Sequence, residues 1–218
     1  MYTKHTWQSD RYFNFNFAQY LPQNFDSTKK YPLVLFLHGA GERGDDLEIA
    51  TRHGYLKYVR EEGKEYPFIC IAPQCPDNKY WGCYTESLLA FLDYICDILP
   101  IDRQRIYLTG FSMGGTGTWM LAMAAPERFA AIAPICGSGI YWNAGSLKDI
   151  PVFMYHGDCD NVVPIEGSID MLKAINKSGG NAQLKICYGV GHNAWDYAYT
   201  DDALTEWMMG KIKDLGIS

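Results

Sequence analysis

The chain has 218 residues with 25 acidic and 19 basic side chains, which gives a formal net charge of −6. A hydrophobic fraction of 48% and a charged fraction of 20% provide enough apolar surface for a folded core, so intrinsic disorder is excluded. The acidic balance would repel phosphates and argues against nucleic acid as a partner. We expect one domain over residues 1–218.

The N-terminal segment MYTKHTWQSDRY lacks the apolar stretch of a signal peptide, and no apolar run approaches the roughly 20 residues that span a bilayer. No membrane association is therefore expected. The seven cysteines include no C-x-x-C pair, which argues against a zinc site and favours a cytoplasmic protein. Two alternatives stay open: Cys75 and Cys83 could pair in an oxidising compartment, and a secreted protein trimmed of its signal peptide would look the same.

Short apolar runs recur along the chain, and each ends at a glycine, a proline or a polar turn. The first run alternates, with Phe13, Phe15 and Phe17 on one face, as in a half-buried strand. The later runs are continuously apolar, which is typical of strands buried on both faces of a mainly parallel sheet. The predicted strands are Tyr12–Tyr20, Leu33–Leu37, Phe68–Ala72, Arg105–Thr109, Ala130–Cys136, Val152–Tyr155 and Leu184–Tyr188.

Amphipathic or small-residue segments between these runs predict helices. The predicted helices are Glu86–Leu99, Gly114–Ala125, Ile165–Asn176 and Asp201–Leu215. Strands that alternate with helices predict an α/β fold, a mainly parallel central sheet with helices on both faces. In such a sheet the functional residues gather at the carboxyl ends of the strands.

The predicted strand Arg105–Thr109 leads directly into the sequence GFSMGG, and a helix follows. This is a G-x-S-x-G motif, in which a sharp turn strains the serine backbone and leaves room only for small neighbours. The turn would project the Ser112 hydroxyl above the sheet at the start of a helix. The alternative, a chance match, is weakened by the strand before the motif and the helix after it. We predict Ser112 as a nucleophile.

A serine nucleophile needs a base, and the base needs a carboxylate that fixes its tautomer. His192 lies in the sequence GVGHNAW, after the last predicted strand and beyond Ser112. Asp158 and Asp160 both follow the strand Val152–Tyr155, in the sequence HGDCDNVVP. The chain order of serine, acid and histidine is that of an α/β-hydrolase, but spacing alone does not separate the two carboxylates.

The first buried strand ends in HGAGERG, residues 38–44, which also matches the dinucleotide-binding pattern G-x-G-x-x-G. That reading requires an apolar helix inside the motif and an acidic residue ending the next strand, whereas ERGDDLE is polar and the next strand ends in APQ. We favour an oxyanion loop, in which the backbone N–H groups of Ala40 and Met113 would hold the developing negative charge. His38 is expected to be structural and His53 to be a surface residue.

The four motifs HGAGERG, GFSMGG, HGDCDNVVP and GHNAW, in this order, resemble the α/β-hydrolase superfamily. The resemblance is strongest to small esterases of the phospholipase/carboxylesterase, dienelactone-hydrolase and polyhydroxybutyrate-depolymerase-like groups, which include feruloyl and acetylxylan esterases. It implies an α/β-hydrolase fold and a triad of Ser112, Asp160 and His192, with Asp158 shaping the turn. Dienelactone hydrolases carry a cysteine in place of this serine, which argues against a dienelactone substrate.

The segment after the strand Ala130–Cys136 bears on the substrate. Only residues 137–150 separate this strand from the next, whereas the superfamily commonly inserts a lid here, so we expect no large lid and an open site. Three loop tryptophans, Trp81, Trp142 and Trp195, could form a platform for a phenolic acyl group or a sugar. Packing within their loops is an equally good reading of each.

These features predict a serine carboxylesterase that works through an acyl-enzyme and needs neither a metal nor an organic cofactor. The expected substrate is a small-molecule or carbohydrate-linked ester, such as a feruloyl, cinnamoyl or acetyl ester of plant carbohydrate. A serine peptidase of the prolyl-oligopeptidase type is one alternative, since related sequences are often labelled predicted peptidases. A catalytically silent, hydrolase-like binding protein is another. The sequence makes no prediction of the oligomeric state.

Overall fold

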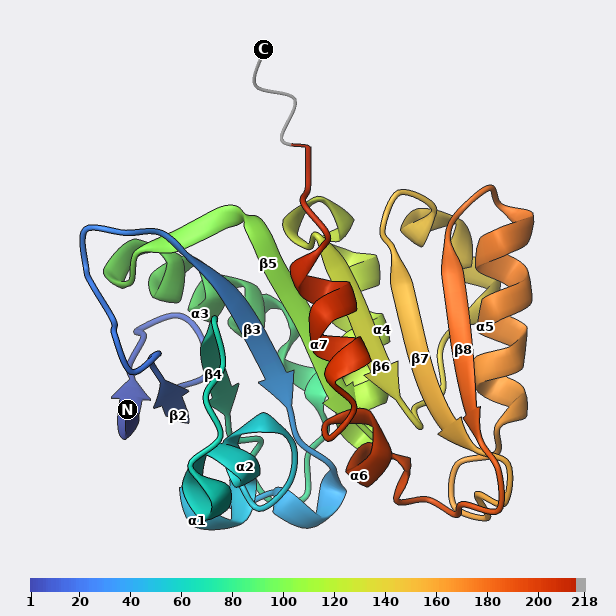
Figure 1. Cartoon of the computed structure of the whole chain (residues 1–218), viewed down its shortest axis with the longest axis horizontal. Helices are drawn as coiled ribbons and strands as arrows, with labels where there is room; N and C mark the ends of the chain where they lie inside the picture. The colour runs from blue at the N-terminus through green and yellow to red at the C-terminus, as the bar shows by residue number, and fades with distance from the viewer. Residues whose placement is uncertain (215–218) are drawn as a thin grey trace.

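A computed structural model of the chain describes residues 1–214 and contains one eight-stranded sheet (Figure 1). The strand order is β1-β2-β4-β3-β5-β6-β7-β8, with β1 and β2 antiparallel to their neighbours and the remaining pairs parallel. The strands are β1 Tyr2–Trp7, β2 Phe15–Tyr20, β3 Tyr31–Leu37, β4 Ile69–Pro73, β5 Ile101–Phe111, β6 Ala131–Ile135, β7 Val152–Gly157 and β8 Ala182–Cys187.

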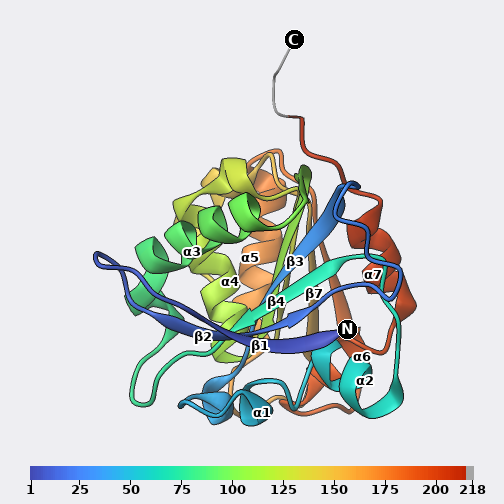
Figure 2. The same ribbon diagram turned by 90° about the vertical axis from the view of Figure 1, so that its left-hand side faces the viewer.

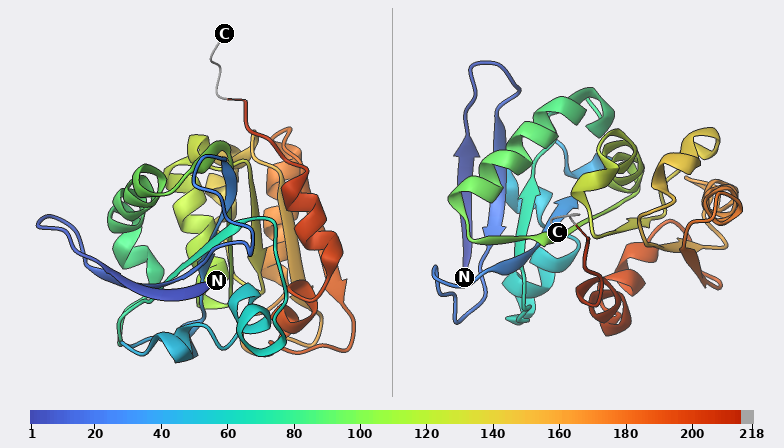
Figure 3. Two further views of the ribbon diagram at one scale, coloured as in Figure 1. Left: turned by 60° about the vertical axis from the view of Figure 1, so that its left-hand side comes forward. Right: turned by 90° about the horizontal axis from the view of Figure 1, so that it is seen from above.

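Helices cover both faces of this sheet, and the views in Figures 2 and 3 show the three layers. Helices α3, α4 and α5 pack on one face, and α2, α6 and α7 pack on the other. The helices are α1 Leu47–Ala50, α2 Tyr55–Glu62, α3 Thr85–Ile98, α4 Met113–Ala124, α5 Glu166–Lys177, α6 Ala194–Ala198 and α7 Asp202–Met209. The 3₁₀ helices are η1 Ala40–Glu42, η2 Trp81–Tyr84, η3 Pro126–Arg128 and η4 Tyr141–Leu147.

Strand β3 shows why the central runs are continuously apolar. Leu33, Leu35 and Leu37 belong to the core beneath α3, α4 and α5. Val34 and Phe36 belong to the second core, beneath α2, α6 and α7. Because successive side chains of a strand point to opposite faces, a strand covered on both sides needs apolar residues at every position. The predicted α/β architecture with a mainly parallel sheet is confirmed.

The N-terminal edge of the sheet differs from its prediction. β1, with the sequence YTKHTW, was not predicted, because an edge strand open to solvent on one side can carry polar residues. The strand predicted over Tyr12–Tyr20 begins only at Phe15, and Phe13 is 37% exposed in the connection before it. The alternating pattern therefore extended into the loop that joins the two antiparallel strands.

Four helices also differ from the sequence prediction. Helix α7 ends at Met209 and is followed by Gly210, a residue of low helix propensity, so the helix predicted over Asp201–Leu215 is too long. The last residue of that prediction, Leu215, lies outside the described residues. Helices α1, α2 and α6 were not predicted, and all three are short. Within residues 1–214, no helix combines the length and the apolar character needed to cross a membrane.

Candidate active site

The carboxyl ends of β3, β5, β6 and β7 meet at one edge of the sheet, at the lower end in Figure 1. A cavity of about 330 Å³ opens there. Its lining includes Ser112, His192, Trp195 and residues 39–42 from the loop after β3. The motifs recognised in the sequence therefore converge on one cavity, as expected for a parallel α/β sheet.

Ser112 lies between the end of β5 and the first residue of α4, in a backbone conformation that is rare for a residue with a side chain. Its φ is 54° and its ψ is −119°, and its N–H donates to the Ile135 carbonyl at 2.9 Å. Such conformations cost about 1–3 kcal/mol and persist only when the surroundings impose them. A Cβ on Gly114 would come within 1.9 Å of the Leu37 carbonyl oxygen, so α4 and β3 approach too closely for any side chain.

The three side chains predicted to cooperate form one hydrogen-bonded series. The Ser112 hydroxyl lies 2.7 Å from His192 Nε2, and His192 Nδ1 lies 2.7 Å from Asp160 Oδ2. The serine is 80 residues and the aspartate 32 residues from the histidine along the chain. In this arrangement the hydroxyl donates to Nε2 while Nδ1–H donates to the carboxylate, which is the orientation a general base needs.

Asp160 is buried and ionised. Its Oδ1 accepts hydrogen bonds from the N–H groups of Val162 and Val163, both at 2.9 Å. Burial raises the pKa of Asp160, but the hydrogen bond from His192 and the two backbone N–H donors outweigh burial and leave this pKa below its usual value. The group beneath the imidazole is therefore a carboxylate, able to stabilise an imidazolium.

The structure separates the two carboxylates that the sequence left as alternatives. Asp158 Oδ1 accepts from the N–H of Gly189 at 2.7 Å, and the side chain is exposed. It thus joins the loops after β7 and β8, whereas Asp160 holds the histidine. This division agrees with the turn-shaping role that the family resemblance implied for Asp158.

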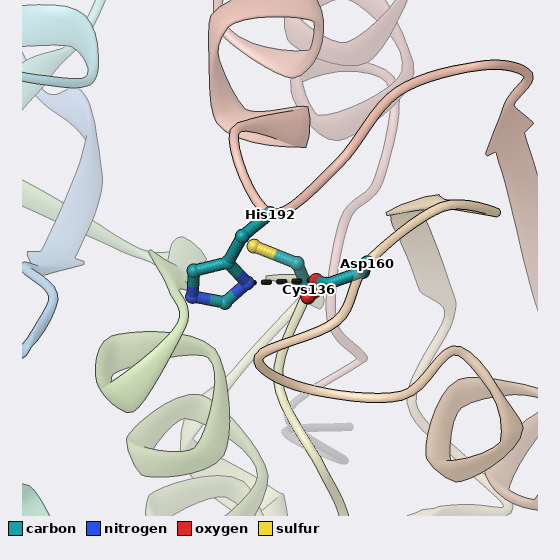
Figure 4. A group of neighbouring side chains, drawn as sticks. All are labelled: Cys136, Asp160 and His192. Atoms are coloured by element: carbon teal, nitrogen blue, oxygen red, sulfur yellow. Dashed lines mark hydrogen bonds and ion pairs between the residues drawn. The ribbon is translucent and has the colours of Figure 1, made fainter.

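Two further buried groups approach the His192–Asp160 pair. His156 Nε2 lies 2.8 Å from the Val163 carbonyl and 3.2 Å from Asp160 Oδ2. Cys136 is the second group, and its Sγ, one carboxylate oxygen of Asp160 and one ring nitrogen of His192 all lie within 4.8 Å of one another (Figure 4). This trio is a conceivable set of metal ligands. Burial raises the pKa of the Cys136 thiol, however, and an existing hydrogen bond joins the other two members, so the arrangement disfavours a metal ion.

The predicted oxyanion donors occupy suitable backbone positions. Ala40 is the first residue of η1 and Met113 the first of α4, and the first N–H groups of a helix have no acceptor within that helix. Ala40 also lines the cavity. The loop that carries it is held by Arg52, whose Nη2 donates to the Gly41 carbonyl at 3.2 Å and to Glu42 Oε1 at 2.7 Å. Backbone donation by Ala40 and Met113 stays a prediction.

An aromatic wall lines the cavity beside the histidine. The ring centroids of Phe111 and Trp195 are 4.6 Å apart, and each lies about 5.5 Å from the ring of His53. His53 Nδ1 and Trp195 Nε1 are buried, and within residues 1–214 neither has a hydrogen-bond partner. His53, predicted as a surface residue, is partly exposed and lines the cavity, a position that the sequence did not indicate. No motif marks this residue, and its role in the wall depends on the packing of the loop before α2 against β5.

The three candidate platform tryptophans have different positions. Trp195 lines the cavity. Trp81 is buried at 1% exposure, packs over Gly117 and donates from Nε1 to the His38 carbonyl at 2.9 Å, so its assignment to a platform is wrong. Trp142 is 77% exposed on η4 and packs edge-on against Tyr141. Its place in a substrate platform stays a prediction.

The cysteines suggested as a pair are both free thiols. Cys75 is buried and Cys83 is exposed. Burial raises the pKa of Cys75 to about 12, as expected for an inert structural thiol. The structure therefore gives no support to the alternative that these two residues form a disulfide.

Curated relatives of the chain include fungal esterases. A probable feruloyl esterase C of Aspergillus terreus is 30% identical over 174 residues, which cover 77% of this chain and 64% of the relative. A bifunctional acetylxylan esterase/xylanase of Neocallimastix patriciarum is 36% identical over 149 residues, which cover 66% of this chain and 21% of that protein. The chain thus spans a little over three fifths of the feruloyl esterase C relative and a smaller part of the bifunctional one.

Solved structures share the fold. A thermostable esterase superposes on 97% of this chain and 63% of its own with a TM-score of 0.87 and 32% identity. The feruloyl esterase module from Clostridium thermocellum complexed with sinapinate has a TM-score of 0.75 at 19% identity, over 94% of this chain and 87% of the module. The predicted α/β-hydrolase fold is confirmed. Residues 84–201, more than half of the sequence, match the phospholipase/carboxylesterase family, and the chain belongs to this family.

Proposed function

We propose that the protein is a serine carboxylesterase in which Ser112 is the nucleophile, His192 the general base and Asp160 the acid of the triad. The observation that carries the proposal is the pair of 2.7 Å contacts that connects hydroxyl, imidazole and carboxylate. A serine hydroxyl is a weak nucleophile unless an oriented base removes its proton. The match to esterase relatives supports an ester as the bond that is broken.

Acylation begins when Ser112 Oγ attacks the ester carbonyl carbon and its proton passes to His192 Nε2. The carbonyl oxygen becomes an oxyanion, which the backbone N–H groups of Ala40 and Met113 hold. Asp160 stabilises the imidazolium without taking its proton. The bond to the alcohol then breaks, and His192 returns the proton to the leaving oxygen.

Deacylation repeats the same steps with water as the nucleophile. His192 removes a proton from water, the resulting hydroxide attacks the acyl-enzyme carbonyl, and the same donors hold the second oxyanion. The bond to Ser112 Oγ breaks, the serine regains its proton, and the free acid leaves. All proton transfers in this cycle use this chain's own side chains.

The shape and polarity of the cavity favour an aromatic acyl group. The rings of Phe111, Trp195 and His53, tilted against one another, form an aromatic wall beside the reacting hydroxyl. His53 Nδ1 and Trp195 Nε1 are buried and have no hydrogen-bond partner within residues 1–214, so a small shift of these rings on binding would bring them to oxygen substituents of such a ring. We therefore place hydroxycinnamoyl esters, such as feruloyl esters of carbohydrate, ahead of acetyl esters. The short segment between β6 and β7 leaves room for a carbohydrate-linked alcohol.

A substrate panel tests this proposal. We expect hydrolysis of p-nitrophenyl acetate and a higher kcat/KM for methyl ferulate than for methyl cinnamate, which lacks the ring oxygens. Feruloyl amide should be cleaved far more slowly, because an amine leaves less readily than an alcohol. A higher rate on the amide would favour the peptidase alternative. No turnover and no labelling of Ser112 by a fluorophosphonate would favour the silent binding protein and overturn the proposal.

A further inference from the structure

The buried histidine beneath the oxyanion loop, expected to be structural, makes hydrogen bonds that packing alone does not explain. His38 follows the end of β3 and is fully buried, with its ring edge-on to Trp81 at a centroid distance of 4.9 Å. Its Nε2 lies 3.0 Å from the backbone nitrogen of Cys75, and its Nδ1 lies 2.7 Å from the carbonyl oxygen of Gly39. Both ring nitrogens therefore contact backbone atoms.

These two contacts determine the tautomer of the ring. The N–H of Cys75 can only donate, so Nε2 must be the acceptor and carry no proton. The single proton of the neutral imidazole then lies on Nδ1 and is donated to the Gly39 carbonyl. Burial lowers the pKa of His38 to about 4, so the ring is neutral near pH 7 and keeps this tautomer.

The Gly39 carbonyl and the Ala40 N–H belong to one peptide group. In a planar trans peptide the C=O and N–H bonds point in opposite directions. A carbonyl drawn toward the buried ring of His38 therefore turns the Ala40 N–H the other way. Gly39 and Ala40 both line the cavity that contains Ser112, so an N–H turned away from the buried ring has the cavity within its reach.

We propose that His38 is a positioning residue for the oxyanion hole, which fixes the Gly39–Ala40 peptide so that the Ala40 N–H faces the reacting carbonyl. The proposal rests on the serine esterase function proposed above. Glycine restricts its own backbone very little, so this peptide needs an external restraint. The other donor to the Gly39 carbonyl is the Glu42 N–H at 3.4 Å, a longer contact than the 2.7 Å from the ring.

Two substitutions separate the two nitrogens of His38. In His38→Asn, the side-chain amide nitrogen takes the place of Nδ1 and can still donate to the Gly39 carbonyl. In His38→Gln, the side-chain oxygen takes the place of Nε2 and can still accept from Cys75, but nothing replaces the donor to Gly39. Each variant keeps one of the two hydrogen bonds and loses the other, so the two variants differ only in which hydrogen bond is lost.

We expect His38→Gln to lower kcat about 10- to 100-fold with KM changed less than about threefold, because an oxyanion donor acts on the transition state more than on bound substrate. His38→Asn should restore kcat to within about fivefold of wild type. A trifluoromethyl ketone traps Ser112 as a tetrahedral oxyanion, so its inhibition constant should rise in parallel with the loss of kcat in His38→Gln. Urea unfolding of both variants gives the stability readout.

A purely structural histidine predicts a different result. The two variants would then lose stability to similar extents, and kcat and the ketone affinity would not differ between them. Either equal kcat values or an unchanged ketone inhibition constant in His38→Gln would overturn the inference. Fluorophosphonate labelling of Ser112 keeps the two proposals distinguishable. If the wild type is labelled and active but the two variants do not differ, only the role of His38 is refuted. If the wild type is unlabelled and inactive, the esterase function is refuted.

Discussion

The reaction centre and the aromatic wall beside it share one cavity but differ in how their polar atoms are paired. In the centre, Asp160 accepts hydrogen bonds from His192 and two backbone N–H groups, and Ser112 is bonded through both its hydroxyl and its backbone nitrogen. In the wall, within residues 1–214, His53 Nδ1 and Trp195 Nε1 lack partners. In the reaction centre the protein's own groups supply every one of these hydrogen-bond partners. In the wall, we infer that the substrate supplies them.

The largest expected effect comes from removing the nucleophile. Ser112→Ala should lower kcat for p-nitrophenyl acetate about 10⁴- to 10⁶-fold, because no other group in the centre can form the acyl-enzyme. The folded variant, checked by circular dichroism, should also fail to react with a fluorophosphonate. Full turnover by the folded variant would show that the paired centre is not the place of catalysis.

The next effect distinguishes the two neighbouring carboxylates. Asp160→Asn should lower kcat about 10⁴-fold, because an amide can donate to Nδ1 and stabilise the wrong tautomer of His192. Asp158→Asn is the matched control and should change kcat by less than about threefold, since its bonds are to the turn. Steady-state kinetics on methyl ferulate measure both. The reverse order would move the acid to Asp158.

Acid should destabilise the fold through His38, the buried histidine beneath the oxyanion loop next to the reaction centre. The pKa of His38 is about 4 when folded, against about 6.5 in an unfolded chain, so the unfolded state binds more protons between these values. The free energy of unfolding should fall by about 3 kcal/mol as the pH drops from 6.5 to 4, and this contribution is fully present above pH 6.5. Urea unfolding across this range measures the slope.

The same measurement on His38→Asn provides the control, since asparagine does not titrate. Its slope between pH 6.5 and 4 should be shallower than that of wild type by the His38 contribution. His53 is the half-buried counterpart in the wall, where burial also lowers the pKa, so part of the slope should persist in the variant. Identical slopes in wild type and His38→Asn would show that the buried His38 ring does not cause the loss of stability in acid.

The smallest expected effect is on the wall. Trp195→Phe removes the indole N–H and keeps an aromatic ring, so kcat/KM for methyl ferulate should fall about two- to tenfold, the value of one hydrogen bond. Methyl cinnamate, which offers no ring oxygen, is the control substrate and should be nearly unaffected. An equal loss on both substrates would mean that Trp195 contributes shape alone.

The sequence predicted the paired region better than the wall. The serine, histidine and oxyanion loop each belong to a motif whose residues are constrained by local chemistry, such as the glycines around Ser112. The choice of Asp160 over Asp158 came from family resemblance, because both carboxylates follow the same strand. The wall is assembled from the loop before α2, the end of β5 and the start of α6. No local pattern marks such a contact, so His53 was missed.

Trp81 and β1 illustrate two reasons why the sequence prediction differs from the structure. A tryptophan in a predicted loop carries no sign of which way it points, and here η2 directs Trp81 into the core over Gly117. Strand β1 carries polar residues because it lies at an open edge of the sheet, so hydrophobic periodicity gives it little signal. Both outcomes depend on tertiary neighbours rather than on the local sequence.

The positive φ of Ser112 has a consequence for the order of events during folding. The backbone there is held by Ile135 of β6 and by the close approach of Gly114 to Leu37 of β3. Before these strands have joined β5, no contact imposes the strained turn, so the Ser112 hydroxyl stays unreactive. After dilution from urea, the onset of Ser112 labelling by a fluorophosphonate would therefore report when the central strands have come together. We expect this onset to be later than the recovery of the helical circular dichroism signal.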